Sequence, residues 1–240
     1  MEKVVEGVYR LGSRWVNFYL VDDSGAITVV DAGLPGYIDQ VHAALDALER
    51  KPSDVKAIVL THTHTDHLGT LPALAEMSGA PVFVPGPEAD ILRGDRKPVP
   101  PKGVLRTMWR PHMWRFIAHA GANRGMSSVT YRDCTPYDEG VQLDVPGRLQ
   151  PVATPGHSSG HMVLTMESSD LLFCGDALAT FAVDSGKTGP MIHPFNEDRE
   201  LAVRSLDALE PLRADVMLPG HGEPWQGSPG AAVAAARQTL

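Results

Sequence analysis

Apolar residues in the first part of the chain recur at two different spacings. Short apolar runs at residues 4–10, 16–21 and 26–31 are separated by polar turn residues, and this pattern predicts three successive strands. Across residues 37–50 the apolar positions recur at helical spacing instead, so we predict a helix there. The chain therefore begins with strands and continues into a helix.

The next segment repeats this alternation. Residues 56–60 form an apolar run typical of a buried strand, and a helix is expected over residues 68–77. A further strand is expected at residues 81–84. A helix should then begin near Pro87, because proline is favoured at the first helical position. Strands that alternate with helices predict an α/β fold.

The middle of the chain, about residues 94–140, departs from this regularity. Trp109, Trp114 and Phe116 lie there among many arginines, and Pro111 is expected to kink or break any helix. We interpret this stretch as an insertion with some helix of its own, carried by a single domain that spans residues 1–240.

Regular alternation returns in the last part of the chain. Strands are expected at residues 149–153, 162–166, 171–174 and 215–218. Asn196 is a suitable N-cap for a helix that extends to about residue 212, and Ser228-Pro229 should start a final, alanine-rich helix.

Composition narrows the class of protein. The chain has 240 residues, 43% of them hydrophobic, which suits one large α/β domain or two intimately packed halves. Cys134 and Cys174 are the only cysteines, so a disulfide framework is not expected. A formal net charge of -8 disfavours a nucleic acid partner. With no apolar run of about 18 residues, we expect no membrane partner and a cytoplasmic location.

One short polar segment carries most of the candidate chemistry. Residues 61–69 read Thr-His-Thr-His-Thr-Asp-His-Leu-Gly and follow directly on the apolar strand at residues 56–60. His62 and His64 are two positions apart, so in an extended backbone both imidazoles point the same way. Asp66 and His67 come where the strand gives way to a helix and can turn toward a second point. Such a cluster can hold two metal ions at once.

This segment resembles the HxHxDH motif of the metallo-β-lactamase superfamily. Other motifs of that superfamily follow in the same order along the chain: Thr154-Pro155-Gly156-His157, Gly175-Asp176 and Pro219-Gly220-His221-Gly222, with Val30-Asp31-Ala32-Gly33 resembling an early supporting motif. The resemblance covers about residues 15–225. It implies a four-layer αββα sandwich.

The resemblance also implies a ligand set. It assigns His62, His64 and His157 to a first metal, and Asp66, His67 and His221 to a second, with Asp176 as the bridge between them. Asp31 and His161 are then candidates for orienting these ligands. The two cations are expected to be Zn²⁺, since zinc suits imidazole and carboxylate, although Mn²⁺ or Fe²⁺ could also occupy such a site.

The implied chemistry is hydrolysis by a hydroxide that bridges two cations. Asp66 is the expected proton shuttle, and the substrate is expected to be an ester, lactone or thioester of a small molecule. Four alternatives stay open: a persulfide dioxygenase-like enzyme with a single iron, a small-molecule phosphodiesterase, a β-lactamase-type amidohydrolase, and a ligand-binding protein without catalysis.

The insertion and one further histidine are candidates for substrate contacts. As a lid, residues 94–140 would place Trp109, Trp114 and Phe116 over the metals, and Arg110 or Arg115 could meet a carboxylate or phosphate. Equally, these aromatics could pack on the domain surface or in a homodimer contact. His193 is expected to line the pocket, with loop packing as the alternative.

Overall fold

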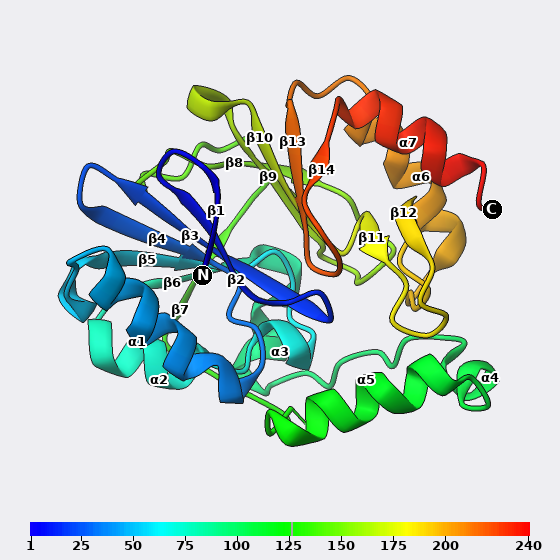
Figure 1. Ribbon diagram of the computed structural model, residues 1–240, viewed down its shortest axis with the longest axis horizontal. Helices are drawn as coiled ribbons and strands as arrows, with labels where there is room; N and C mark the ends of the chain where they lie inside the picture. The colour runs from blue at the N-terminus through cyan, green and yellow to red at the C-terminus, as the bar shows by residue number, and fades with distance from the viewer. Residues whose placement is uncertain (126) are drawn as a thin grey trace.

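Two β-sheets face each other in the middle of the molecule, and helices cover the outer face of each sheet (Figure 1). The computed structural model describes residues 1–125 and 127–240. Buried apolar residues fill the space between the two sheets as well as the space between each sheet and its helices. The architecture is therefore the expected αββα sandwich.

The first sheet contains seven strands in sequence order. The strands are Glu2–Val5 (β1), Val8–Ser13 (β2), Val16–Asp23 (β3), Ala26–Val30 (β4), Val55–Val59 (β5), Val82–Pro85 (β6) and Cys134–Tyr137 (β7). Strands β1 to β4 pair antiparallel, whereas β4 to β7 pair parallel. Val30 of β4 lies opposite Val59 of β5. The segments that follow these two strands, which begin at Asp31 and Leu60, therefore leave the sheet side by side.

The second sheet has the order β14-β13-β10-β9-β8. Its strands are Gln150–Ala153 (β8), Met162–Met166 (β9), Leu171–Gly175 (β10), Val216–Pro219 (β13) and Trp225–Gln226 (β14), and a separate small hairpin joins Ala179–Phe181 (β11) to Thr188–Met191 (β12). The parallel pair β10 and β13 places Gly175 opposite Pro219. Consequently Asp176 and His221 emerge at the same edge of this sheet.

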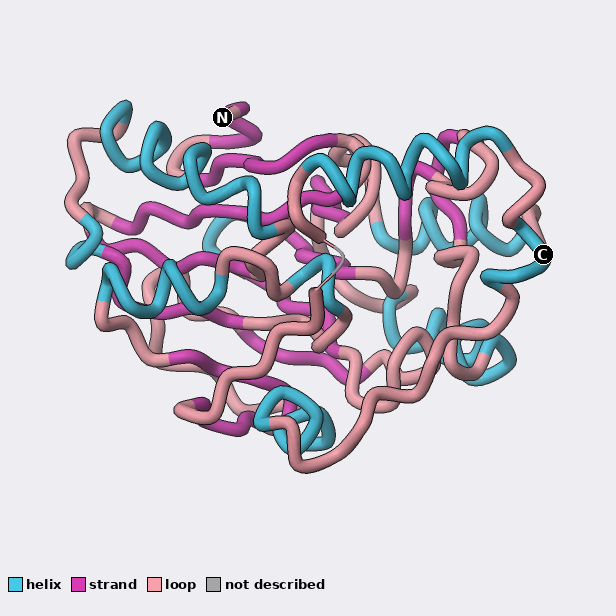
Figure 2. The backbone as a smooth tube through the Cα atoms, turned by 90° about the horizontal axis from the view of Figure 1, so that it is seen from below, coloured by secondary structure: helices cyan, strands magenta, loops and turns pink. Residues whose placement is uncertain are grey.

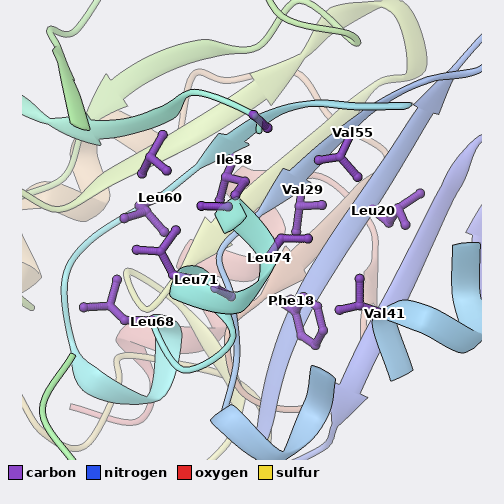
Figure 3. Packing of buried hydrophobic residues seen from close by; sticks show 14 of the residues in the cluster. Phe18, Leu20, Val29, Val41, Val55, Ile58, Leu60, Leu68, Leu71 and Leu74 are labelled. Carbon is purple, nitrogen blue, oxygen red and sulfur yellow. The ribbon is translucent and has the colours of Figure 1, made fainter. Parts of the chain in front are cut away.

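Helices cover the two outer faces. The first sheet carries Ile38–Ala47 (α1), Leu71–Ser78 (α2) and Ala89–Arg93 (α3), and the second carries Arg199–Leu209 (α6) and Pro229–Arg237 (α7). Figure 3 shows Leu71 and Leu74 of α2 and Val41 of α1 packed on the strands of the first sheet. Fully burying a leucine or valine side chain stabilises the fold by about 1.5–3 kcal/mol, so this interface fixes the helices on the sheet.

Several expected elements differ in their boundaries. Residues 4–10 are not one strand, because the chain turns between β1 and β2 at Gly7, whose φ of 72° suits glycine. Asn196 does not cap α6. The cap is Asp198, whose side chain accepts a hydrogen bond from the Leu201 amide. Ser228 caps α7 as expected, by accepting from the Ala231 amide.

The segment expected to be an insertion contains two helices and one strand of the first sheet. Val104–Thr107 (α4) and Pro111–Ala122 (α5) lie outside the two sheets, along the lower edge of Figure 1. Pro111 does not break the helix; it occupies the first turn of α5, where its missing N–H costs nothing. Strand β7 pairs with β6, so the part outside the sheets ends before Cys134.

The two cysteines form no disulfide. Cys134 and Cys174 are both buried free thiols, as expected from the sequence. None of the described helices is both long enough and apolar enough to cross a membrane.

Candidate metal centre

Ends of strands from both sheets meet at one edge of the sandwich and bring the predicted ligands together. His62 and His64 follow β5, Asp66 and His67 lie in a 3-10 turn over Thr65–His67, and Asp176 follows β10. Figure 2, which views the molecule from below, shows that many loops lie on this side of the strands. Segments far apart in sequence therefore supply one cluster of imidazoles and carboxylates.

The cluster divides into two groups linked by one carboxylate. Donor atoms of His62, His64 and His157 lie within 4.8 Å of one another, and so do those of Asp66, His67 and His221. Asp176 lies between the groups: its Oδ2 is 3.3 Å from His157 Nε2 and 3.1 Å from His221 Nε2. The seven predicted ligands thus converge in the predicted grouping.

The orientation of the donor atoms fits a cation. Among the described residues, His62 Nε2, His67 Nε2 and Asp176 Oδ1 are buried without a hydrogen-bond partner. His64 Nδ1 and His157 Nε2 are 2.8 Å apart. Buried polar atoms are normally paired, and the three partnerless atoms belong to the same cluster as this pair of histidines. A divalent metal ion would satisfy them together.

Electrostatics in the cluster favours added positive charge. Burial and the neighbouring histidines hold the pKa of His62 well below its ordinary value, so its imidazole is neutral and free to donate a lone pair. Burial opposes ionisation of Asp176, yet nearby histidines, His221 first, hold its pKa well below the usual range. For His67, the carboxylates of Asp176 and Asp66 outweigh burial and raise the pKa. A bound cation would supply positive charge beside these carboxylates and would displace the proton from His67.

Asp31 sets the orientation of one histidine from each group. Its carboxylate lies 3.2 Å from His67 Nδ1 and accepts from the Thr61 hydroxyl at 2.9 Å and the Thr61 amide at 2.8 Å. Since the Thr61 hydroxyl donates to Asp31, it accepts from His62 Nδ1 at 3.0 Å. Both Nε2 atoms are left facing the cluster. Asp31 also lies near His62 and His67 in a group that could itself hold a metal, but these hydrogen bonds engage its oxygens.

Replacing Asp31 with asparagine is expected to weaken metal binding about 10–100-fold, because an amide cannot accept on both sides and leaves the tautomers of His62 and His67 undefined. Competition with a chelator would measure the affinity. Asp39, an acidic residue in the first turn of α1, provides the matched control: Asp39→Asn should bind metal as the parent does. Equal affinities for Asp31→Asn and Asp39→Asn would remove Asp31 from this role.

His161 acts on the backbone of Asp176. Its Nε2 accepts from the Asp176 amide at 2.9 Å, so its Nδ1 carries the proton and donates to the Thr154 hydroxyl at 2.8 Å. Burial lowers the pKa of His161 to about 3, which keeps the ring neutral. Both nitrogens are therefore engaged, and the residue can orient Asp176 but has no lone pair for a metal.

A buried glutamate that sequence reasoning missed ties the first group together. Glu88 is fully buried, and its Oε2 accepts from the Thr63 amide at 2.7 Å and the Thr63 hydroxyl at 2.5 Å. Its Oε1 accepts from the Ser158 hydroxyl and, at 3.0 Å, from the Gly160 amide. Thr63 stands between His62 and His64, and Ser158 follows His157. One carboxylate thus joins the two loops that carry the first group.

A pocket of about 390 Å³ opens onto the cluster. Phe116 and His193, two of the candidates for substrate contacts, line it together with Asp66 and His221. The pocket wall is mostly apolar, and its described lining contains no lysine or arginine: the lining residues are Leu34, Thr63, His64, Thr65, Asp66, Pro98, Val99, Pro100, Pro101, Val104, Met113, Phe116, Ile117, Ala120, Gly125, His157, Asp176, Val183, His193, Phe195 and His221.

The other candidates from the middle segment lie elsewhere. Trp109 and Trp114 are 77% and 55% exposed and do not line the pocket, because the inner side of α5 carries Phe116 instead. Arg110 forms an ion pair with Asp184, and Arg115 is exposed outside the pocket. Of the two alternatives left open by the sequence, the lid that would place both tryptophans and an arginine over the metals therefore disagrees with this arrangement, except at Phe116.

His193 lies deeper than the prediction required. Its Nδ1 is 2.9 Å from the Phe195 carbonyl oxygen, to which it donates, so the Nε2 lone pair faces inward, 3.8 Å from Asp176 Oδ2. His157, Asp176 and His193 form a further group that could hold a metal. The spacing along the sequence did not indicate this proximity, because His193 lies on the loop after β12, far from the recognised motifs.

Comparisons with known proteins agree with this geometry. The chain is 25% identical over 245 residues to YflN of Bacillus subtilis, described as a probable metallo-hydrolase, covering 94% of this chain and 87% of that protein. It is 27% identical over 196 residues to a hydroxyacylglutathione hydrolase of an Enterobacter species, covering 81% of this chain and 56% of that relative.

Solved structures and a family profile point the same way. A metallo-beta-lactamase family protein from Thermus thermophilus superposes with a TM-score of 0.69 at 27% identity, covering 97% of this chain and 79% of that one. The profile of the metallo-beta-lactamase superfamily matches residues 14–221, a span that includes every predicted metal ligand. The chain therefore belongs to the metallo-beta-lactamase superfamily.

Proposed function

We propose that this protein is a binuclear metal-dependent hydrolase of small carboxylic esters, lactones or thioesters with an apolar acyl group. The convergence of His62, His64 and His157 with Asp66, His67 and His221 around Asp176 is the observation that carries the proposal. Zn²⁺ is the proposed metal, because imidazoles and carboxylates together suit it.

Two divalent cations held by these groups would supply a nucleophilic water at neutral pH and polarise the attacked carbonyl oxygen. The protein's own residues supply the rest. Asp66 has a side chain that is 23% exposed and lines the pocket, so its carboxylate can accept the proton of the attacking water. His193 is held through its Nδ1, which donates to the Phe195 carbonyl oxygen, and its Nε2 can accept a hydrogen bond from a substrate hydroxyl or amide.

The walls of the pocket indicate the substrate class. Phe116, Ile117 and Met113 of α5 form an apolar wall beside the metal-ligand cluster. A substrate that carries several carboxylates, such as a glutathione thioester, would be expected to meet lysine or arginine, and none is among the described lining residues. The hydroxyacylglutathione hydrolase relative supports thioester chemistry, whereas the pocket favours an apolar acyl group.

Elemental analysis of the purified protein, combined with a panel of esters, lactones, thioesters, phosphodiesters and β-lactams, tests the proposal. We expect two equivalents of zinc and turnover of apolar esters, lactones or thioesters. A single iron with oxygen consumption would instead identify a dioxygenase. Turnover restricted to phosphodiesters or β-lactams would contradict the proposed substrate class.

Replacing Phe116 with alanine is expected to raise KM about tenfold for a long-chain acyl ester and much less for an acetyl ester, because the lost ring removes apolar contact with the chain. KM measured against acyl length would show this. Trp114→Ala, on the outer face of the same helix, should leave KM unchanged at every length. Identical KM values for the two variants would contradict the pocket assignment.

A further inference from the structure

Large exposed apolar side chains concentrate on one short segment. Leu105 is 89% exposed, Trp109 77%, Trp114 55% and Val99 51%. Apart from the two terminal residues, Val141 is the only other large hydrophobic residue exposed to this degree in the described chain. Isolated exposed apolar residues are ordinary, but a cluster of this kind marks an interaction surface.

The same segment is strongly basic within an acidic protein. Residues 96–132 contain eight lysines and arginines and no aspartate or glutamate, although the net charge of the chain is -8. In the described structure, only Arg110 and Arg132 of these eight form ion pairs, with Asp184 and Asp95. The remaining six basic residues are exposed: Arg96, Lys97, Lys102, Arg106, Arg115 and Arg124.

Helix α5 separates this surface from the pocket. Its inner side carries Met113, Phe116 and Ile117, which line the pocket, whereas Trp114 and Arg115 point away and are exposed. Helices α4 and α5 lie along the outer edge of the molecule, beyond both sheets (Figure 1). We call the outward surface formed by Val99, Leu105, Trp109 and Trp114 with the neighbouring basic residues Lys102, Arg106 and Arg115 the α4–α5 face.

We propose that the α4–α5 face docks on the anionic surface of a lipid bilayer. Tryptophan and leucine interleaved with lysine and arginine suit the boundary between lipid head groups and acyl chains. Each basic residue adds attraction to anionic lipids. The sequence-based expectation of no membrane partner rested on the lack of a spanning segment, and docking on a surface requires none.

Charge argues against the main alternative, a second copy of this chain. A symmetric dimer places the same patch of both subunits in contact, so it would bring Lys102, Arg106 and Arg115 of one α4–α5 face against those of the other. An acidic protein would match the charge. However, the exposed Leu105, Trp109 and Trp114 beside these basic residues suit the interfacial region of a bilayer better.

Docking in this way would set the pocket beside the lipid. Val99 belongs to the α4–α5 face and also lines the pocket, as do Pro100, Pro101 and Val104 next to it in sequence. An apolar molecule dissolved in the bilayer could then reach the pocket along this segment without crossing bulk water. This inference does not rest on the proposed hydrolysis.

Co-sedimentation of the full-length, metal-loaded protein with lipid vesicles tests the proposal. We expect binding to vesicles of equal parts phosphatidylserine and phosphatidylcholine, a blue shift of tryptophan emission, little binding to phosphatidylcholine alone, and release by salt. Arg106→Glu and Arg115→Glu should each weaken binding at least about fivefold. Lys56→Glu, a charge reversal at an exposed lysine of β5, is the matched control and should bind as the parent does.

Two further variants test the apolar part of the face. The double variant Trp109→Ser, Trp114→Ser should lose the blue shift and most of the binding, whereas Val141→Ser should keep both. Circular dichroism would verify that each variant is folded. Equal binding to both kinds of vesicle, no binding to either, or parental binding by the double variant would overturn the proposal. So would a dimer in solution that the double variant abolishes, since that result would assign the face to a second copy.

Discussion

Replacing His62 or Asp176 with alanine is expected to lower kcat/KM at least about a thousandfold and to reduce the metal content of the protein. His62 supplies one of the three donor atoms of the first group, and Asp176 lies between the two groups. Removal of either leaves the remaining donors without a complete coordination sphere, and the several kcal/mol that metal ions contribute to the transition state are lost. Metal analysis and steady-state kinetics on the same preparation would measure both effects.

The matched control for His62→Ala is His42→Ala, because His42 is an exposed histidine of α1. It should keep parental metal content and turnover. The two ligand variants should also differ from each other: His62→Ala is expected to retain part of the second metal, whereas Asp176→Ala should weaken both sites. Full metal stoichiometry and full turnover in His62→Ala would refute the proposed ligand set.

Replacing Glu88 with alanine is expected to destabilise the fold by about 3–5 kcal/mol, which is the cost of removing one partner from a buried charged network. Four donors, from Thr63, Ser158 and Gly160, would lose their acceptor. Glu88→Gln should lose less stability than Glu88→Ala but more than none, because the NH₂ group of the new side chain would face hydrogen-bond donors at one end. Urea unfolding of the metal-free variants would give the free energies of unfolding.

A second measurement tells whether Glu88 positions the first group of metal ligands or only stabilises the fold. Because Glu88 joins the loops that carry His62, His64 and His157, its loss should weaken the first metal more than the second. Glu76→Ala, at an exposed glutamate of α2, should change neither stability nor metal affinity. Equal weakening of both metals by Glu88→Gln would reduce Glu88 to a general stabilising residue.

Metal ligands were accessible to sequence reasoning because their signal is local. Residues 61–67 place four potential donors after one buried strand. His157 and His221 each follow a Pro-Gly pair, and Asp176 follows a glycine. The residues that orient the ligands were harder to predict from the sequence. Asp31 could be expected from its motif, but no prediction was made for Glu88, since its partners lie 25, 70 and 72 residues away.

Errors in the middle segment have a physical cause. Aromatic residues at positions 109, 114 and 116 all qualify as pocket walls in sequence. Trp109 lies between α4 and α5, and the rotation of α5 about its axis decides whether Trp114 or Phe116 turns inward. Packing of Met113 and Phe116 in a cluster with Phe181 and Phe195 sets that rotation. It leaves Trp114 on the opposite side, where its indole donates to the Met108 carbonyl at 2.7 Å.

By itself the sequence determined the α/β class and the order of most strands and helices, because both follow from the spacing of apolar residues along the chain. Its short motifs also carried the resemblance to a known family that implied the seven proposed ligands. The tertiary structure alone decided which donors face one another, that Glu88 and His193 belong to the same centre, and which side of α5 meets the pocket. Those properties depend on how strand ends and helix faces that are far apart in sequence pack together. This packing cannot be inferred from the spacing of neighbouring residues.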